Sequence, residues 1–147
     1  VEHVEDARAR GARIAYGGTR PEGAVFEQGH FFQPTVLLDV DHSMKVMREE
    51  TFGPVAPVMT FRDSAEAIRL ANDTPYGLVA YVFTTDLKTA FQAAEEIEAG
   101  TIGINNVAGG EVPFPYAGWK ESGLGVELSH HGLEEYLLIK HVRVELV

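Results

Sequence analysis

Two adjacent glutamates, Glu49 and Glu50, and the nearby Phe52 form the most chemically suggestive cluster of this sequence. Neighbouring side chains on an extended backbone point to opposite sides, so at most one carboxylate faces a given cleft. The following Gly53 and Pro54 favour a rigid turn. A carboxylate can accept hydrogen bonds from ribose hydroxyls, and a fixed ring can pack on a flat cationic heterocycle. A nucleotide site is one interpretation; a solvated carboxylate near a helix end is the simpler one, and both stay open at this point.

Other catalytic patterns fail on their spacing. The segment beginning at Gly123 lacks the third glycine of a dinucleotide-binding loop, and Lys120 replaces the first glycine of a nucleophile elbow at Ser122. His130 and His131 are adjacent, and neighbours on a helix diverge by about 100°, so we expect no metal site there. The sequence contains no cysteine, which excludes disulfides, thiolate metal sites and a cysteine nucleophile within it.

Composition narrows the class of protein further. A chain of 147 residues suits one domain with its own core, and 45% hydrophobic residues indicate a globular chain. A formal net charge of −10 argues against nucleic-acid binding. The apolar runs are too short for a membrane span, and residues 1–10 are too polar for a signal peptide. The cysteine-free composition is compatible with a cytoplasmic protein.

The first part of the chain shows short elements separated by a long loop. Residues 1–10 have helical spacing, and 13–16 resemble a short strand. Residues 17–29 are rich in glycine and proline and predict a loop. A strand is expected within 31–40, and one short helical turn within 42–50.

Strands and helices then alternate. Residues 55–61 predict a strand, and 63–73 a helix with Asp63 as its N-cap and Glu66 as the capping-box partner. The apolar run 78–84 predicts a strand buried on both faces. Residues 85–100 predict a helix, and 101–105 a strand. The expected apolar stripe of that helix consists of Leu87, Ala90, Phe91, Ala94 and Ile97, and its expected exposed face contains Glu95, Glu96 and Glu98.

The last part of the chain begins with a long loop over 105–125. A helical segment interrupted by Gly132 is expected over 128–138, and an alternating strand over 139–146. The alternation predicts an α/β fold with a largely parallel sheet, in which ligands bind beyond the carboxyl ends of the strands. The loops 44–54 and 105–125 are therefore the first places to look for a site.

Several of these segments occur together, and in the same order, in one known family. The sequence resembles the C-terminal portion of the aldehyde dehydrogenase superfamily over essentially its whole length. The segments that carry the resemblance are FFQPTVLLDV, EETFGPV, ANDTPYGLVAYVFTTDL, GTIGIN, GWKESGLGVE and GLEEYLLIKHVRVEL.

The resemblance assigns roles to three residues. It implies that Glu50 binds the nicotinamide ribose, that Phe52 flanks the nicotinamide, and that Tyr116 stands at an aromatic position of the substrate channel. The family usually has P-F-G-G-x-K where this chain has PYAGWK, so Ala117 replaces a glycine. Many relatives also have arginine in place of Val126. These departures bear on substrate preference and on contacts near the subunit boundary.

The resemblance also implies the reaction and the organisation of the chain. The parent enzyme would oxidise an aldehyde to a carboxylic acid with NAD or NADP, through a cysteine thiolate that this chain lacks. We therefore expect no catalytic residue here and no activity of the chain alone. Residues 1–137 would form the C-terminal part of the catalytic domain, and 138–147 an oligomerisation strand of a homo-oligomer. A non-catalytic binding or assembly module, or one half of a split enzyme, remains the alternative.

Overall fold

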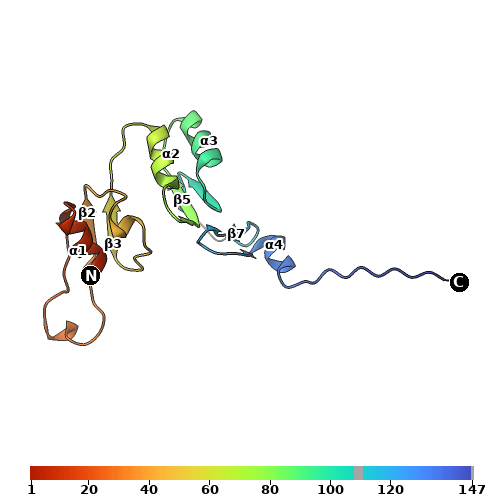
Figure 1. Ribbon diagram of the computed structural model, residues 1–147, viewed down its shortest axis with the longest axis horizontal. Helices are drawn as coiled ribbons and strands as arrows, with labels where there is room; N and C mark the ends of the chain where they lie inside the picture. The colour runs from red at the N-terminus through yellow and green to blue at the C-terminus, as the bar shows by residue number, and fades with distance from the viewer. Residues whose placement is uncertain (108–110, 147) are drawn as a thin grey trace. The chain divides into compact units, whose positions relative to one another are not determined.

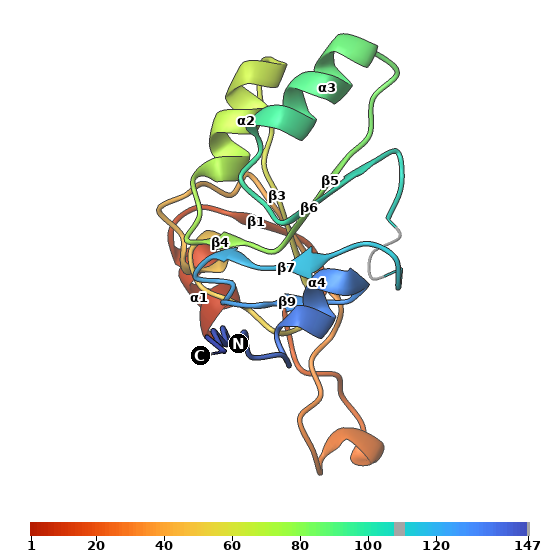
Figure 2. The ribbon, with the colours of Figure 1, turned by 90° about the vertical axis from the view of Figure 1, so that its right-hand side faces the viewer.

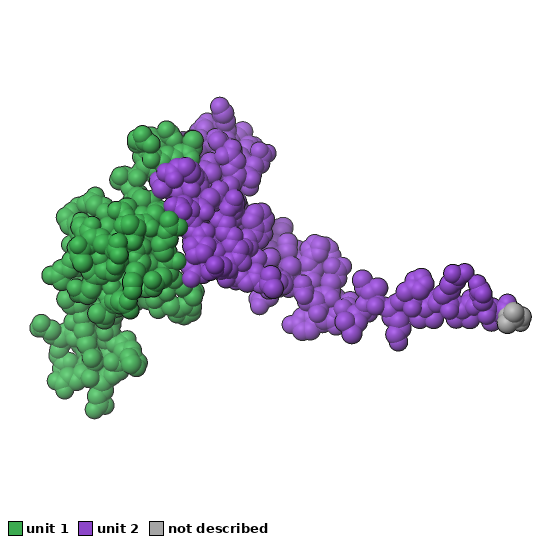
Figure 3. All heavy atoms as spheres, viewed as in Figure 1, with its two compact units in different colours: residues 1–67 green, residues 68–147 purple. Residues whose placement is uncertain are grey.

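The computed structural model describes residues 1–107 and 111–146. The chain forms two compact units, Val1–Ala67 and Ile68–Val147, which are coloured separately in Figure 3. Each unit combines short helices with a parallel strand pair, so the predicted α/β class is confirmed. The parallel pairs belong to two separate small sheets.

Unit 1 is built on a three-stranded sheet of order β1-β2-β3 (Figure 1). Strand β2 pairs antiparallel with β1 and parallel with β3. The elements are α1 (Glu2–Ala9), β1 (Arg13–Tyr16), η1 (Ala24–Phe26), β2 (Thr35–Leu38), η2 (Lys45–Met47) and β3 (Val55–Val58). The predicted helix, strands and helical turn of this region are confirmed; β1 has the predicted bounds, whereas β2 and β3 are shorter than expected.

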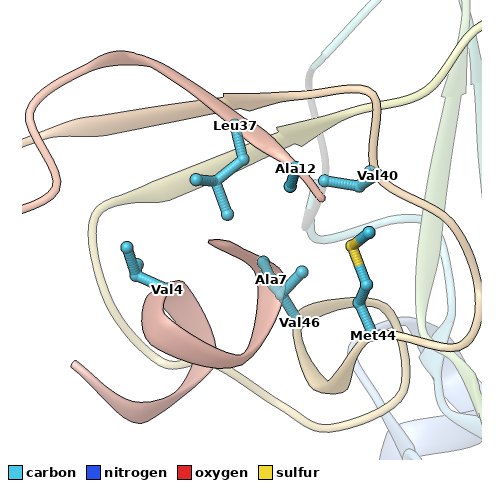
Figure 4. Close-up of a cluster of buried hydrophobic side chains, with 7 residues drawn as sticks. All are labelled: Val4, Ala7, Ala12, Leu37, Val40, Met44 and Val46. Carbon is cyan, nitrogen blue, oxygen red and sulfur yellow. The ribbon is translucent and has the colours of Figure 1, made fainter. Parts of the chain in front are cut away.

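Helix α1 packs on this sheet through the apolar face that its spacing predicts. Val4 and Ala7 are buried and meet Leu37 of β2, which is fully buried (Figure 4). Met44, just before η2, and Val46, within it, complete the same buried cluster. The short helix and the segment after β2 therefore share one core.

Unit 2 contains several small pairings. Strands β5 and β6 are parallel, whereas β4 pairs with β8 and β7 with β9 in antiparallel fashion. Helix α4 lies against β9 (Figure 2). The elements are α2 (Ser64–Asn72), which spans the unit boundary, β4 (Tyr76–Gly77), β5 (Val79–Val82), α3 (Leu87–Glu96), β6 (Thr101–Ile104), β7 (Tyr116–Ala117), β8 (Trp119–Lys120), β9 (Val126–Glu127) and α4 (Ser129–Glu134).

The two longer helices begin at side-chain caps. Asp63 accepts a hydrogen bond from the Glu66 amide at 2.8 Å, as predicted. The Glu66 carboxylate also accepts from the Arg62 amide at 2.8 Å, one residue before the cap. Asp86 caps α3 by accepting from the Thr89 amide at 2.8 Å. The hydrogen bonds from the Thr89 hydroxyl and then from the Thr89 amide lower the pKa of Asp86.

Two predictions about burial in unit 2 were wrong. The run 78–84 is not buried on both faces, because β5 pairs only with β6 among the described strands and Tyr81 is 46% exposed. The buried face of α3 carries Ala93, with Ile97 just beyond the helix end, whereas Leu87 and Phe91 are exposed. Apolar periodicity therefore identified the helix but not the part of its surface that this unit covers.

The glycine in the last helix was also misread. Gly132 does not interrupt α4; it is buried within it, and an added Cβ would lie 3.0 Å from the carbonyl carbon of Glu127. Close packing of helix and strand explains the glycine. The expected loop 105–125 contains β7 and β8, and its residues 108–110 lie outside the described residues.

Residues 138–146 pair with no other described segment and are assigned no strand. Their alternating Val142, Val144 and Leu146 are all exposed. A strand needs a partner to form a ladder, so alternation alone does not produce one. Pairing of this segment with another subunit stays a prediction. Across the described part of the chain, no helix is long and apolar enough to cross a bilayer.

Candidate functional site

The corner between η2 and β3 carries Glu50 and Phe52, and backbone hydrogen bonds fix both of its ends. The Glu49 amide donates to the Lys45 carbonyl at 2.8 Å, and the Pro54 carbonyl accepts from the Thr35 amide at 2.8 Å. The corner is therefore attached to the helical turn before it and to the neighbouring strand.

Phe52 is held in an unusual conformation. Its φ of 43° lies in the left-handed region, which costs a residue with a Cβ roughly 1–2 kcal/mol. The residue is 94% exposed, so burial within this unit does not offset that cost. Strain of this kind concentrates at binding sites, where the surrounding structure enforces it. A bend is present at Gly53 and Pro54, where a rigid turn was predicted, and the positive φ of Phe52 was not foreseeable from the residue type.

The Glu50 carboxylate is exposed, and it has no hydrogen-bond or ion-pair partner within residues 1–107 and 111–146. Its neighbour Glu49, in contrast, bonds to His3 of α1. This difference agrees with the expectation that the two adjacent carboxylates face opposite sides. A solvent-facing, unpartnered carboxylate next to an exposed ring can receive hydroxyl donors from a ligand.

A cavity of about 390 Å³ adjoins the corner within unit 1. Its lining residues include Phe52, Gly53 and Pro54 of the corner, together with Arg20 and Phe31. Glu50 is not among its lining residues. The cavity therefore offers a partly aromatic wall, and the Glu50 carboxylate lies outside its lining.

Charged groups attach helix α1 to the segment that precedes the corner. The Lys45 ammonium pairs with the Glu2 carboxylate, which lowers the pKa of Glu2 and raises that of Lys45. Asp6 accepts from the Lys45 amide at 2.8 Å and from the Arg10 guanidinium at 2.8 Å, and these bonds lower the pKa of Asp6. Both carboxylates therefore favour their charged form while α1 is docked.

Tyr116, the predicted substrate-channel residue, lies in unit 2 on β7 and is half-buried. It lines a cavity of about 320 Å³ together with Leu78, Val126 and Tyr136. The two predicted groups, Glu50 with Phe52 and Tyr116, thus belong to different units, and each neighbours a cavity of its own unit.

Two further residues of unit 2, Lys120 and Asn72, form bonds between distant segments, and sequence reasoning missed both. Lys120 lies at a φ of 52°, forms an ion pair with Glu98 at 2.6 Å, and donates to the Asn72 carbonyl at 2.8 Å. The Asn72 side chain donates to the Glu96 carbonyl and accepts from the Glu98 amide. The sequence analysis singled out Lys120 only in a failed nucleophile elbow and did not single out Asn72, because both bonds join segments distant in the sequence.

The described residues contain no group of three or more His, Asp or Glu side chains arranged to hold a metal ion. The rings of His130 and His131 lie with centroids 3.8 Å apart and planes tilted by 40°, and His131 lies 3.5 Å from the Glu134 carboxylate. Their rings therefore contact each other and a nearby acid.

Comparison with known proteins gives a consistent result. The sequence model of the Aldehyde dehydrogenase family matches residues 1–142. The chain is 47% identical over 145 residues to the succinate-semialdehyde dehydrogenase (NADP(+)) of Escherichia coli (strain K12), covering 99% of this chain and 29% of that protein. It is 43% identical to a glutarate-semialdehyde dehydrogenase of Pseudomonas putida, again covering 99% and 29%.

Solved structures agree with the sequence relatives. A betaine aldehyde dehydrogenase of Staphylococcus aureus matches with a TM-score of 0.90 at 43% identity, over 99% of this chain and 30% of that one. The same enzyme solved in complex with NAD+ matches with a TM-score of 0.88 at 42% identity, over 100% of this chain and 31% of that one. The chain thus spans about 30% of the length of the proteins it matches.

Proposed function

Because the chain belongs to the aldehyde dehydrogenase family, we propose that it supplies one wall of the active site of an NAD- or NADP-dependent enzyme that oxidises an aldehyde to a carboxylic acid. The Escherichia coli relative is named for NADP(+), and a Staphylococcus aureus relative was solved with NAD+. The chain contributes residues that bind and orient the cofactor, and the enzyme is proposed to be homo-oligomeric and cytoplasmic.

The observation that carries the proposal is the geometry of the corner. The Glu50 carboxylate is exposed and unpartnered among the described residues, and the Phe52 ring beside it is held open at a φ of 43°. A carboxylate accepts from two neighbouring ribose hydroxyls, and an exposed ring packs on a flat cationic nicotinamide. These residues therefore fit the cofactor, which when bound supplies the hydride acceptor.

Tyr116 is proposed to contribute to the wall of the aldehyde channel. Its ring lines a cavity of its own unit, and the phenolic hydroxyl adds a hydrogen-bond donor where the family usually has phenylalanine. A buried polar group discriminates best among substrates that can pair with it. Tyr116 is thus a proposed determinant of which aldehyde fits.

The reaction itself needs groups from outside these 147 residues. Thioester chemistry requires a thiolate, and the sequence contains no cysteine. The chain's residues therefore orient the cofactor and shape the channel, while the nucleophile comes from elsewhere. We propose that the chain on its own has no aldehyde oxidation activity.

Replacing Glu50 by Gln in the full-length enzyme that contains this chain tests the cofactor assignment. The change removes the charge but keeps the shape, and a lost charge-assisted hydrogen bond costs about 1.5–3 kcal/mol. NAD+ or NADP+ should therefore bind about 10- to 150-fold more weakly, measured by fluorescence titration without aldehyde. Glu95→Gln makes the same change on the exposed face of α3 and should have no effect. Unchanged affinity in Glu50→Gln would reject the role of Glu50.

A further inference from the structure

One imidazole bonds to the residues on both sides of Glu50. His3 of α1 has its Nε2 atom 3.0 Å from the Glu49 carboxylate and its Nδ1 atom 3.1 Å from the Thr51 hydroxyl. The two partners lie 46 and 48 residues along the chain, and the His3 side chain is only 16% exposed. Glu50 lies between the two bonded residues and does not itself bond to the ring.

The chemistry of the three groups makes this arrangement stable. An ionised carboxylate only accepts hydrogen bonds, so the Nε2–H group of His3 donates to Glu49. The Thr51 hydroxyl can donate to a bare Nδ1 or accept from a protonated one. Both contacts therefore survive in the neutral and in the charged form of His3.

We propose that His3 is a positioning residue for the cofactor-binding corner, an inference that rests on the proposed function. Glu49 and Thr51 both bond to His3 of α1, so the backbone between them is held at two points and Glu50 is left free of the ring. Holding Thr51 also restrains the backbone immediately before Phe52, whose φ of 43° would otherwise relax. One side chain thus orients both the carboxylate and the ring.

Helix α1 can serve as a platform because it is itself fixed to the same segment. Val4 and Ala7 anchor it in the core, and Asp6 accepts from the Lys45 amide at 2.8 Å. Preorganised groups bind a ligand more tightly because less conformational freedom is lost on binding. The position of His3, distant in sequence but adjacent in space, is therefore suited to preorganising Glu50.

The test uses His3→Leu in the full-length enzyme, with His3→Gln as the conservative variant and His130→Leu on α4 as the matched control. Loss of the contacts to Glu49 and Thr51 should weaken NAD+ or NADP+ binding about 3- to 10-fold in a titration without aldehyde. His3→Gln keeps an amide donor and acceptor and should recover part of the affinity. His130→Leu should leave it unchanged.

A second readout needs neither activity nor cofactor. In the cofactor-free enzyme, amide hydrogen exchange over residues 49–53 should accelerate about tenfold in His3→Leu, less in His3→Gln, and not in the control. A corner that exchanges as slowly in both His3 variants as in the unsubstituted enzyme overturns the inference. If His3→Leu does not fold, His3→Gln decides through the same two measurements.

Combining the variants separates positioning from general stabilisation. If His3 acts through Glu50, adding His3→Leu to Glu50→Gln should weaken binding much less than it does alone. Fully additive losses would overturn the inference while leaving the cofactor role of Glu50 intact. Unchanged binding in Glu50→Gln would reject the proposed cofactor role of Glu50, and with it this inference.

Discussion

Replacing Gly100 by alanine should distort unit 2 at one identifiable contact. Gly100 precedes β6 and donates its amide to the Gly77 carbonyl at 3.1 Å. A Cβ added to Gly100 would lie 1.7 Å from the carbonyl oxygen of Ala117 in β7. Contacts shorter than 3.0 Å do not occur for real Cβ atoms, so these two atoms must separate by more than about 1.3 Å.

The expected loss of stability depends on which atoms have to move. The obstacle is backbone of β7, whose Ala117 pairs with Val126 of β9, so it cannot move aside without disturbing that ladder. Overpacking of a well-packed site costs about 1–3 kcal/mol, and a backbone obstacle places Gly100→Ala at the upper end. For a chain of this size about 3 kcal/mol corresponds to a fall in Tm of roughly 6–12 °C.

The 147-residue chain provides a local probe for this test, because Trp119 is its single tryptophan. The added Cβ would lie 3.5 Å from Trp119 Cδ1, so the fluorescence emission of the ring should change along with the melting curve. Gly11→Ala is a useful control: its φ of 102° strains an alanine, yet no atom lies within 4 Å of the added Cβ. Gly11→Ala should lower the Tm without altering the emission.

A nearly neutral control completes the series. In Gly53→Ala the nearest atom to the added Cβ is 3.7 Å away, at ordinary contact distance, so the Tm should stay within about 2 °C. If Gly100→Ala also melts within about 2 °C of the unsubstituted chain and keeps its emission spectrum, then β7 does not lie against Gly100 and the reasoning is refuted.

Two further predictions concern the 147-residue chain as a whole. Assayed alone with several aldehydes and NAD+ or NADP+, it should reduce no cofactor above a heat-treated control, because its sequence contains no cysteine; clear turnover would contradict this. The chain should also form a homo-oligomer in light scattering at micromolar concentration, since the exposed apolar side chains of 138–146 invite pairing with another copy. Deleting residues 140–147 should yield monomers, and an oligomer that survives the deletion would reject this segment as its cause.

Much of the local structure of unit 1 was predictable because short-range signals determine it. Gly11 follows a helix with regular apolar spacing, and the strand over Arg13–Tyr16 was predicted with the observed bounds. The Asp63 cap likewise depends on residues three positions apart. In each case the side chains that specify the element are neighbours in the sequence.

Burial and the site contacts depended on partners distant in the sequence. Leu87 and Phe91 satisfy the helical period, yet the part of α3 that unit 2 covers is set by β5 and β6. The contacts of His3 with Glu49 and Thr51 join segments more than 40 residues apart, and no local pattern announces them. The sequence thus identified Glu50 and Phe52 as candidates, but the helix that orients them became apparent only in three dimensions.

The backbone of Phe52 has a consequence for any attempt to make this protein more robust. A non-glycine residue at a φ of 43°, with its ring in solvent, is a position where a stability-driven design procedure would substitute glycine or asparagine. Such a change would relieve roughly 1–2 kcal/mol of backbone strain. It would also remove the ring that the strain holds open. A more stable protein obtained in this way would have lost the ring that we propose packs on the cofactor.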